Sequence, residues 1–340
     1  MDRRLILAVA GSGKTTLLIN SLNLNQRFLI VTYTNNNHDH IRRCIIDKFG
    51  YFPINITLLT YFQFLIRICY RPFLRNVYNS KGITWQYPDE WTRYKSDKNH
   101  YMTHSGYLYS NRLAKLCLQE SKYEIKERIE KYYDCFMFDE IQDLGGHDFN
   151  LIQEIIPTKI DCFFVGDFFQ HTFDTSNDGN VNSSLYKVYK IYKQKWYRIG
   201  VNIDEDTLSN SYRCSQTICD FVSQKLLIKI NSHREDSTNI TFVNTEEDAD
   251  LLFNDNTKVK LFIKESHKYC CFAENWGKSK GLDSFNDICI VLNANTLKLY
   301  KKNLLHTLPA STLNKLYVAC TRAKGNIYFI PHIYIDKFKK

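Results

Sequence analysis

Residues 8–16, AVAGSGKTT, follow the apolar run Leu5-Ile6-Leu7 and have the pattern of a phosphate-binding loop. In such a loop a buried strand runs into a glycine-rich turn, and a helix begins at the lysine. The glycines allow backbone N–H groups to surround phosphate oxygens, and the helix N-terminus adds partial positive charge. The strict pattern has glycine where this chain has Ala8. We therefore expect this segment to bind a nucleoside triphosphate, with Lys14 on the β- and γ-phosphates.

Further polar residues follow two later apolar runs, CFMFDEIQD (135–143) and CFFVGDFFQ (162–170). The carboxyl ends of parallel strands meet at one sheet edge, so we expect Asp139 to lie beside the phosphate loop. There Asp139 and the Thr15 hydroxyl would hold Mg²⁺, and Glu140 would polarise the attacking water. Gln170 would sense the γ-phosphate.

The amino-acid composition gives a separate indication of the binding partner. The 340-residue chain has a net charge of +9, with 23 Tyr and 22 Phe. Basic charge combined with aromatic rings suits single-stranded nucleic acid, although an AT-rich genome produces the same enrichment. No run approaches the ~18 apolar residues of a membrane span, and the 11 cysteines include no CxxC pair. We expect buried free thiols, neither disulfides nor zinc, no membrane association, and a cytoplasmic location or one wherever the nucleic acid is.

Strand-like and helix-like runs alternate along the chain, which predicts an α/β fold with open parallel sheets. The expected strands are 5–9, 27–32, 56–59, 135–138, 162–165, 240–243, 259–263, 288–292 and 326–330, and the expected helices are 15–22, 38–48, 61–70, 111–131, 148–155, 214–229 and 311–323.

Two segments interrupt this alternation. Residues 72–110 are rich in Tyr, Trp, Asn, Lys and Pro, which predicts a short, partly irregular insertion. The loop signal TSNDGNVNSS (175–184) precedes the basic, aromatic run 186–193. We therefore expect two domains, 1–200 with the insertion and 201–340.

The order of motifs resembles that of superfamily 1 DNA helicases of the UvrD/Rep type over nearly the whole chain. The similar segments beyond the phosphate loop are VTYTNNNHDHIRRCI (31–45), TLLTYFQFLIRI (57–68), DEIQD (139–143), VGDFFQ (165–170), LSNSYRCSQTI (208–218), KSKGLDS (278–284) and LYVACTRAK (316–324). The resemblance implies two tandem RecA-like P-loop NTPase domains, the first with a short 1B-like insertion.

The resemblance also implies residue roles. Arg213 and Arg322 would reach the transferred phosphate from the second domain. The implied nucleotide-binding residues are Gly11, Ser12, Gly13, Lys14, Thr15, Thr16 and Asp283, the implied metal ligands are Thr15 and Asp139, and the implied catalytic residues are Glu140, Gln170, Arg213 and Arg322. The implied cofactors are ATP and Mg²⁺.

We interpret the chain as an ATP-dependent helicase or translocase on single-stranded DNA, in replication, repair or antiphage defence. One alternative is a nucleotide-gated regulatory subunit that senses NTP or DNA and controls a partner nuclease. Another is an NTPase that acts on RNA or in viral or phage replication. Two departures are Gly277, where relatives have His, and the segment after Gln170, where Phe173 is the remaining candidate for base stacking.

We expect hydrolysis to discriminate between ATP and GTP by less than about tenfold, roughly 1.4 kcal/mol. Relatives read adenine with a Gln upstream of the phosphate loop, and only seven residues precede Ala8 in this sequence. A base that is stacked without hydrogen bonds contributes little discrimination. Comparing kcat/KM for the two nucleotides tests this expectation, and a strong ATP preference would contradict it.

We also expect single-strand affinity to fall steeply with salt, because phosphate contacts release counterions. Phe173→Ala should cost less than the ~1–3 kcal/mol of a stacking platform. Titrations of the parent and the variant at several salt concentrations measure both quantities. A shallow salt slope with a large Phe173 effect would reverse this interpretation.

Overall fold

The computed structural model describes residues 2–88, 97–157, 159–172 and 178–340, so Phe173 lies outside the described residues. The chain forms two compact units. Unit 1 comprises Met1–Ile6, Thr15–Gly166 and Asp174–Asp204, and unit 2 comprises Leu7–Lys14, Asp167–Phe173 and Glu205–Lys340. The division into domains 1–200 and 201–340 stays a prediction.

Unit 1 is built on a six-stranded sheet in the order β3-β2-β6-β7-β1-β8. The strands are β1 (Arg3–Leu7), β2 (Phe28–Thr32), β3 (Ile56–Thr60), β6 (Cys135–Asp139), β7 (Asp161–Gly166) and β8 (Asn202–Asp204). β2, β3, β6 and β7 pair in parallel, and so do β1 and β8. β2 and β6 are buried along their whole length, as expected for strands covered on both faces.

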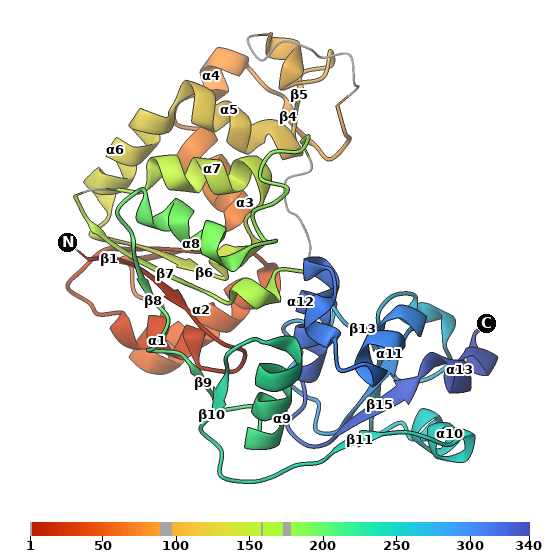
Figure 1. The fold of residues 1–340 in the computed structure, drawn as a ribbon. Coiled ribbons are helices and arrows are strands. Elements are labelled where there is room, and N and C mark those ends of the chain that lie inside the picture. Colours follow the sequence, from red (N-terminus) through yellow and green to blue (C-terminus); the bar gives the residue numbers. More distant parts are fainter. Residues whose placement is uncertain (1, 89–96, 158, 173–177) are drawn as a thin grey trace. The chain divides into compact units, whose positions relative to one another are not determined.

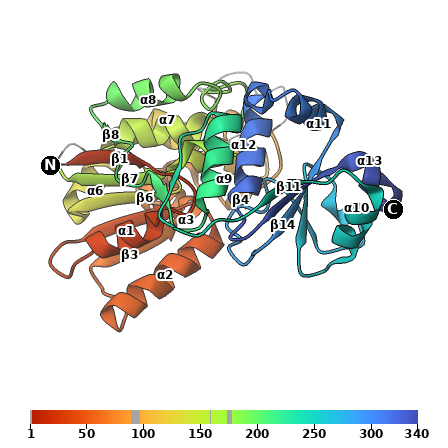
Figure 2. The ribbon, with the colours of Figure 1, turned by 60° about the horizontal axis from the view of Figure 1, so that its bottom comes forward.

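Helices cover both faces of this sheet, with α1 and α2 on one face and α7 and α8 on the other (Figures 1 and 2). Trp196 of α8 is fully buried and packs edge-on against Phe149 of α7. The helices of unit 1 are α1 (Lys14–Ser21), α2 (Asn35–Phe49), α3 (Tyr61–Phe64) continued by η1 (Leu65–Tyr70), α4 (Arg75–Tyr78), α5 (Leu113–Glu120), α6 (Lys122–Tyr132), α7 (Gly146–Ile155) and α8 (Tyr189–Tyr197).

The insertion of unit 1 contains a separate pair of short parallel strands, β4 (Gly82–Thr84) and β5 (Tyr107–Tyr109). Arg112 donates from Nη1 to the His100 carbonyl oxygen at 2.6 Å, and Tyr101 donates its hydroxyl to Gln119 Oε1 at 2.7 Å. These contacts join the insertion to the start and end of α5.

Unit 2 is built on a five-stranded parallel sheet in the order β11-β15-β14-β12-β13. The strands are β11 (Ile240–Phe242), β12 (Val259–Phe262), β13 (Ala273–Asn275), β14 (Ile288–Leu292) and β15 (Ile327–Pro331), and a small second sheet pairs β9 (Asn210–Ser211) with β10 (Asn231–Ser232). The helices are α9 (Gln216–Phe221), α10 (Glu246–Asn254), α11 (Ala294–Lys301), α12 (Ala310–Cys320) and α13 (His332–Ile335).

The central strand β14 serves two hydrophobic cores. Ile288 and Ile290 belong to the core formed with α9 and α12. Cys289 and Val291, which point to the opposite face, belong to the core formed with α10 and α13. The sheet is therefore covered on both sides, in agreement with the predicted α/β class.

Several element boundaries differ from the sequence-based ones. The first strand ends at Leu7 rather than at Val9, because the Val9 N–H bonds the Leu208 carbonyl oxygen instead of a sheet neighbour. The helix expected over 111–131 is two helices separated by Ser121, whose buried hydroxyl bonds the Cys117 carbonyl oxygen. Helices α8, α10 and α11 were not predicted as helices.

Three cysteines expected in strands lie there. Cys135, Cys162 and Cys289 are buried in β6, β7 and β14. Burial raises the pKa of the Cys135 and Cys289 thiols to about 12. Across the residues that the structure describes, no helix has both the length and the apolar character needed to cross a bilayer.

Candidate nucleotide-binding site

The phosphate loop connects β1 to α1, as its sequence pattern predicts. Gly11 and Gly13 have φ angles of +71° and +88°, a region that glycine enters without steric cost. Ser12 donates its hydroxyl to the Val9 carbonyl oxygen at 2.8 Å, which closes the turn. Helix α1 begins at Lys14, so its first backbone N–H groups lie at the end of the loop.

Gly11 also allows a close approach of two segments of unit 2. A Cβ atom on Gly11 would lie 2.6 Å from the Arg213 Cβ and 2.9 Å from the Ser211 Oγ. The Tyr212 N–H donates to the Gly11 carbonyl oxygen at 2.9 Å. The backbone around Arg213 is therefore fixed against the phosphate loop, and any side chain at position 11 would separate them.

A buried tyrosine hydroxyl joins the phosphate loop to the turn that follows β7, in the same unit. The Ala10 N–H donates to Tyr317 Oη at 2.9 Å, and Tyr317 donates to Asp167 Oδ2 at 2.9 Å. The same Asp167 oxygen accepts from Gln170 Nε2 at 3.0 Å. Burial, and then the Asp167 charge, raise the pKa of Tyr317 well above its usual value. Tyr317 therefore stays protonated and orients Asp167, which in turn orients Gln170.

The two predicted arginines share one carboxylate. Asp283 Oδ1 lies 2.6 Å from Arg213 Nη2 and 3.2 Å from Arg322 Nη1. Arg213 also donates from Nη1 to the Thr321 carbonyl oxygen at 3.3 Å. The Arg322 side chain is 2% exposed, whereas that of Asp283 is 59% exposed. Asp283 therefore holds both guanidinium groups at one place, and guanidinium groups are well suited to bind phosphate oxygens.

The predicted acidic residues belong to unit 1. Asp139 is buried at the end of β6. Glu140 follows with a φ of +58°, a left-handed conformation that is uncommon outside glycine, and its Oε2 accepts from Gln142 Nε2. A Cβ on the neighbouring Gly166 would overlap the Gln142 side chain. The turn that carries Glu140 is therefore tightly packed and fixes the carboxylate.

Eight of the predicted site residues belong to unit 2: Gly11, Ser12, Gly13, Lys14, Gln170, Arg213, Asp283 and Arg322. Thr15, Thr16, Asp139 and Glu140 belong to unit 1. The placement of these four beside the phosphate loop stays a prediction, as do all of the assigned roles.

The donors available for Mg²⁺ are hard oxygen atoms, the Thr15 hydroxyl and the Asp139 carboxylate, which fit that ion. Among the described residues, no group of three or more His, Cys, Asp or Glu side chains could hold a metal. Mg²⁺ bound with a nucleotide takes several ligands from phosphates and water, so two protein oxygens are sufficient.

Sequence reasoning assigned no role to Tyr317 or to Asp167. A signal was present in each case. Tyr317 is a hydroxyl-bearing residue in the otherwise apolar stretch LYVAC, and Asp167 directly follows the largely buried strand β7. What the sequence could not indicate was that the two side chains meet, because they lie 150 residues apart.

A family comparison matches a large part of the chain. The model of the viral superfamily 1 RNA helicase core domain matches residues 120–331, more than half of the sequence. That range includes Asp139, Gln170, Arg213 and Arg322, and the phosphate loop precedes it. No curated protein sequence matches the chain.

Solved helicase structures are similar to this chain. The arterivirus nonstructural protein 10 helicase in complex with DNA has a TM-score of 0.51 at 14% identity, over 96% of this chain and 60% of that protein. The PRRSV helicase has a TM-score of 0.49 at 15% identity, over 99% of this chain and 54% of that protein. The arterivirus match shows a shared fold. The chain spans little more than half the length of these proteins.

Tyr317→Phe should lower kcat for nucleotide hydrolysis by about tenfold, because it removes the acceptor of the Ala10 N–H and the donor to Asp167. The same change should destabilise the fold by about 1–3 kcal/mol, since both partners are buried. Steady-state kinetics and denaturant unfolding measure the two effects.

Tyr334→Phe is the matched control, because it removes a tyrosine hydrogen bond of the same unit, to the Asn244 carbonyl oxygen. It should leave kcat unchanged. A Tyr317→Phe enzyme with reduced stability and normal kcat would limit the hydroxyl to a structural role.

Proposed function

This chain belongs to the viral superfamily 1 RNA helicase core family, whose members hydrolyse nucleoside triphosphates, and on that premise we propose that it is a nucleic-acid-stimulated NTPase that moves along a single strand. The observation that carries this proposal is the set of contacts within unit 2. The phosphate loop, the Gln170 turn and the arginine pair are joined there by Gly11, Tyr317 and Asp283.

These contacts support separate roles for three groups of residues during hydrolysis. The loop N–H groups and Lys14 bind the phosphates, and Gln170, oriented through Asp167, contacts the γ-phosphate. Arg213 and Arg322 stabilise the negative charge of the transition state once the nucleotide replaces Asp283 as their partner. Glu140 accepts a proton from the attacking water.

Mg²⁺ held by Thr15 and Asp139 would neutralise charge on the β- and γ-phosphates. ATP is the proposed nucleotide.

The substrate is proposed to be single-stranded nucleic acid. The motif order resembles that of the UvrD/Rep helicases and so supports DNA as the strand. The matched family is described as an RNA helicase core, which supports RNA. Both kinds of strand therefore belong in the test. The net charge of +9 favours a phosphate backbone as partner. A role in genome replication fits either polymer better than the repair or antiphage roles, which rest on the UvrD/Rep resemblance alone.

Lys14→Ala should abolish hydrolysis with nucleotide binding weakened, whereas Glu140→Gln should retain binding and slow turnover by about 10²–10⁴-fold. The two phenotypes should differ because one residue binds phosphate and the other accepts a proton. Lys190→Ala and Glu127→Gln, at exposed positions of unit 1, are the charge-matched controls.

The measurements are steady-state NTP hydrolysis with and without single-stranded DNA or RNA, and binding of a fluorescent nucleotide. Strand-stimulated turnover is the expected result. Nucleotide binding without any strand stimulation would instead favour a regulatory subunit that controls a partner nuclease. Equal loss of nucleotide binding in both variants would contradict the assigned roles.

A further inference from the structure

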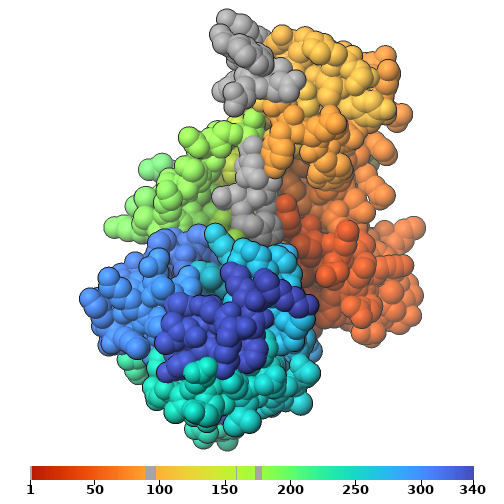
Figure 3. All heavy atoms as spheres, turned by 90° about the vertical axis from the view of Figure 1, so that its right-hand side faces the viewer, coloured from red at the N-terminus to blue at the C-terminus, as the bar shows by residue number. Residues whose placement is uncertain are grey.

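The insertion exposes large aromatic side chains. Trp85, Tyr87 and Tyr107 are 72%, 67% and 41% exposed. In Figure 3 the insertion is the orange to gold surface at the top of unit 1. Several exposed aromatic rings within one short insertion are more informative than single exposed apolar side chains, because grouped exposed apolar surface is typical of an interaction site.

Trp85 packs against another aromatic ring of unit 1. Its ring packs on Phe62 of α3, with centroids 4.9 Å apart and planes inclined by 34°. Phe62 lies in the segment TLLTYFQFLIRI and is itself half-buried. A ring that is fixed by a neighbour and largely open to solvent loses little side-chain entropy when a planar group stacks on it.

Tyr107 is fixed in a different way. It pairs in register with Gly82 across the β4–β5 pair, and a Cβ on Gly82 would lie 3.3 Å from the Tyr107 ring. The ring therefore covers the glycine backbone. Tyr107 also lines a hollow of about 330 Å³ together with Thr84, Gln86 and Ser105, whose polar groups suit the edges of a base. Gln86 is the residue after Trp85, so the hollow begins next to the exposed ring.

The charge of the insertion indicates the class of partner. Its described residues include exposed Arg75, Lys81 and Lys98. Over its whole length, residues 72–110, the sequence has five Lys and Arg and three Asp and Glu, a net charge of +2. Aromatic rings among basic side chains are typical of a surface that binds a nucleic-acid strand, since the rings stack on bases and the charges contact phosphates. An apolar protein surface would not use the basic side chains.

We propose that the β4–β5 insertion is a docking site for a single nucleic-acid strand, in which one base stacks on Trp85 and the following nucleotides enter the hollow lined by Gln86 and Tyr107. This inference rests on the proposed function, because it specifies where the strand of that motor is held. It assigns stacking to the insertion rather than to the segment that contains Phe173.

The test measures affinity of the full chain for fluorescein-labelled 15-nucleotide oligo-dT and oligo-U by anisotropy. Trp85→Ala should weaken binding by about tenfold, equivalent to 1.4 kcal/mol, and Trp85→Phe should recover most of the loss, because a phenyl ring still stacks. Tyr107→Ala should weaken binding severalfold. Lys81→Gln should lower the salt slope of log K by about 0.7 while the aromatic variants leave that slope unchanged.

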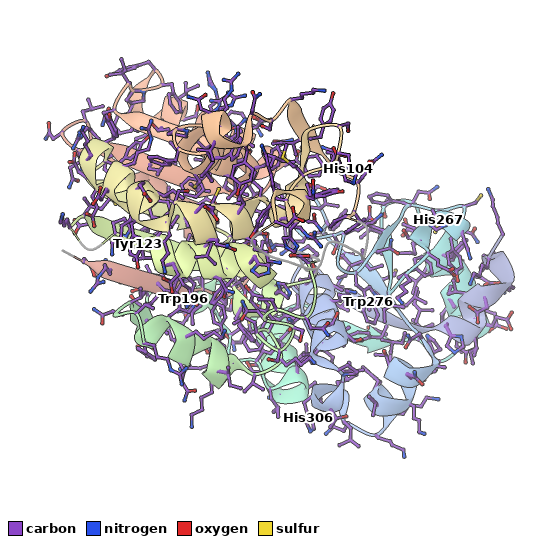
Figure 4. All side chains as sticks on the ribbon, turned by 90° about the horizontal axis from the view of Figure 1, so that it is seen from above. His104, Tyr123, Trp196, His267, Trp276 and His306 are labelled. Carbon is purple, nitrogen blue, oxygen red and sulfur yellow. The ribbon has the colours of Figure 1, made fainter. Side chains whose placement is uncertain are left out.

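The matched control is Tyr123→Ala on α6, a tyrosine that is 71% exposed. Figure 4 shows Tyr123 and the insertion residue His104 at opposite ends of unit 1. This change should alter affinity less than twofold. Basal hydrolysis without a strand should be unchanged in every aromatic variant.

Fluorescence supplies a readout that does not depend on turnover. Trp196 and Trp276 are fully buried, so in a Trp91→Phe background the solvent-accessible emission comes from Trp85. A strand that stacks on Trp85 should quench that emission, and the strand should protect it from iodide.

The outcomes separate this inference from the function on which it rests. If Trp85→Ala leaves strand binding and strand-stimulated hydrolysis unchanged, the docking site is wrong, whatever the effect of Tyr107→Ala. The proposed function would remain intact in that case. A parent chain that binds neither oligonucleotide would overturn both. A tenfold loss in Trp85→Ala with normal basal hydrolysis and normal thermal unfolding supports the site.

Discussion

The hydrogen bond between the Ala10 N–H and the Tyr317 hydroxyl organises the candidate site, because it attaches the phosphate loop to helix α12 of unit 2. Without it the loop would be a glycine-rich turn with a buried donor and no partner, which costs about 1–3 kcal/mol. The second bond of the same hydroxyl, to Asp167, extends the connection to Gln170. One tyrosine side chain therefore contacts both the phosphate loop and the aspartate that orients the Gln170 amide, so a movement of α12 would displace both.

Local patterns predicted the features that depend on local chemistry. The phosphate loop, with positive φ at Gly11 and Gly13, follows from its spacing of glycines, lysine and flanking apolar residues. The strands β6 and β14 follow from apolar runs of the right length. The α/β class and parallel pairing then follow from the alternation of strands and helices.

Features that depend on distant partners were missed or misplaced. The strand at the N-terminus was extended to Val9 because the apolar pattern continues, and nothing local indicates that Val9 bonds Leu208. Helix α8 overlaps the basic, aromatic run 186–193, to which no element was assigned, although Tyr192 and Trp196 repeat at the helical spacing of four and both are buried against α7. The reason for glycine at position 11 is likewise non-local, since it is the proximity of Arg213. Side-chain hydrogen bonds between residues 70 or 150 positions apart cannot be predicted from motif spacing.

The position of Asp283 between the two arginines has a consequence for how a nucleotide leaves. The proposed binding of a triphosphate at these guanidinium groups would exchange the Asp283 carboxylate for another anion. The carboxylate is tethered to the chain, so its effective concentration near the arginines stays high while a phosphate departs. If hydrolysis takes place here as proposed, Asp283 would compete with the released phosphate for the same donors and favour its departure. Each cycle of the proposed motor would then be shortened wherever product release is the slow step.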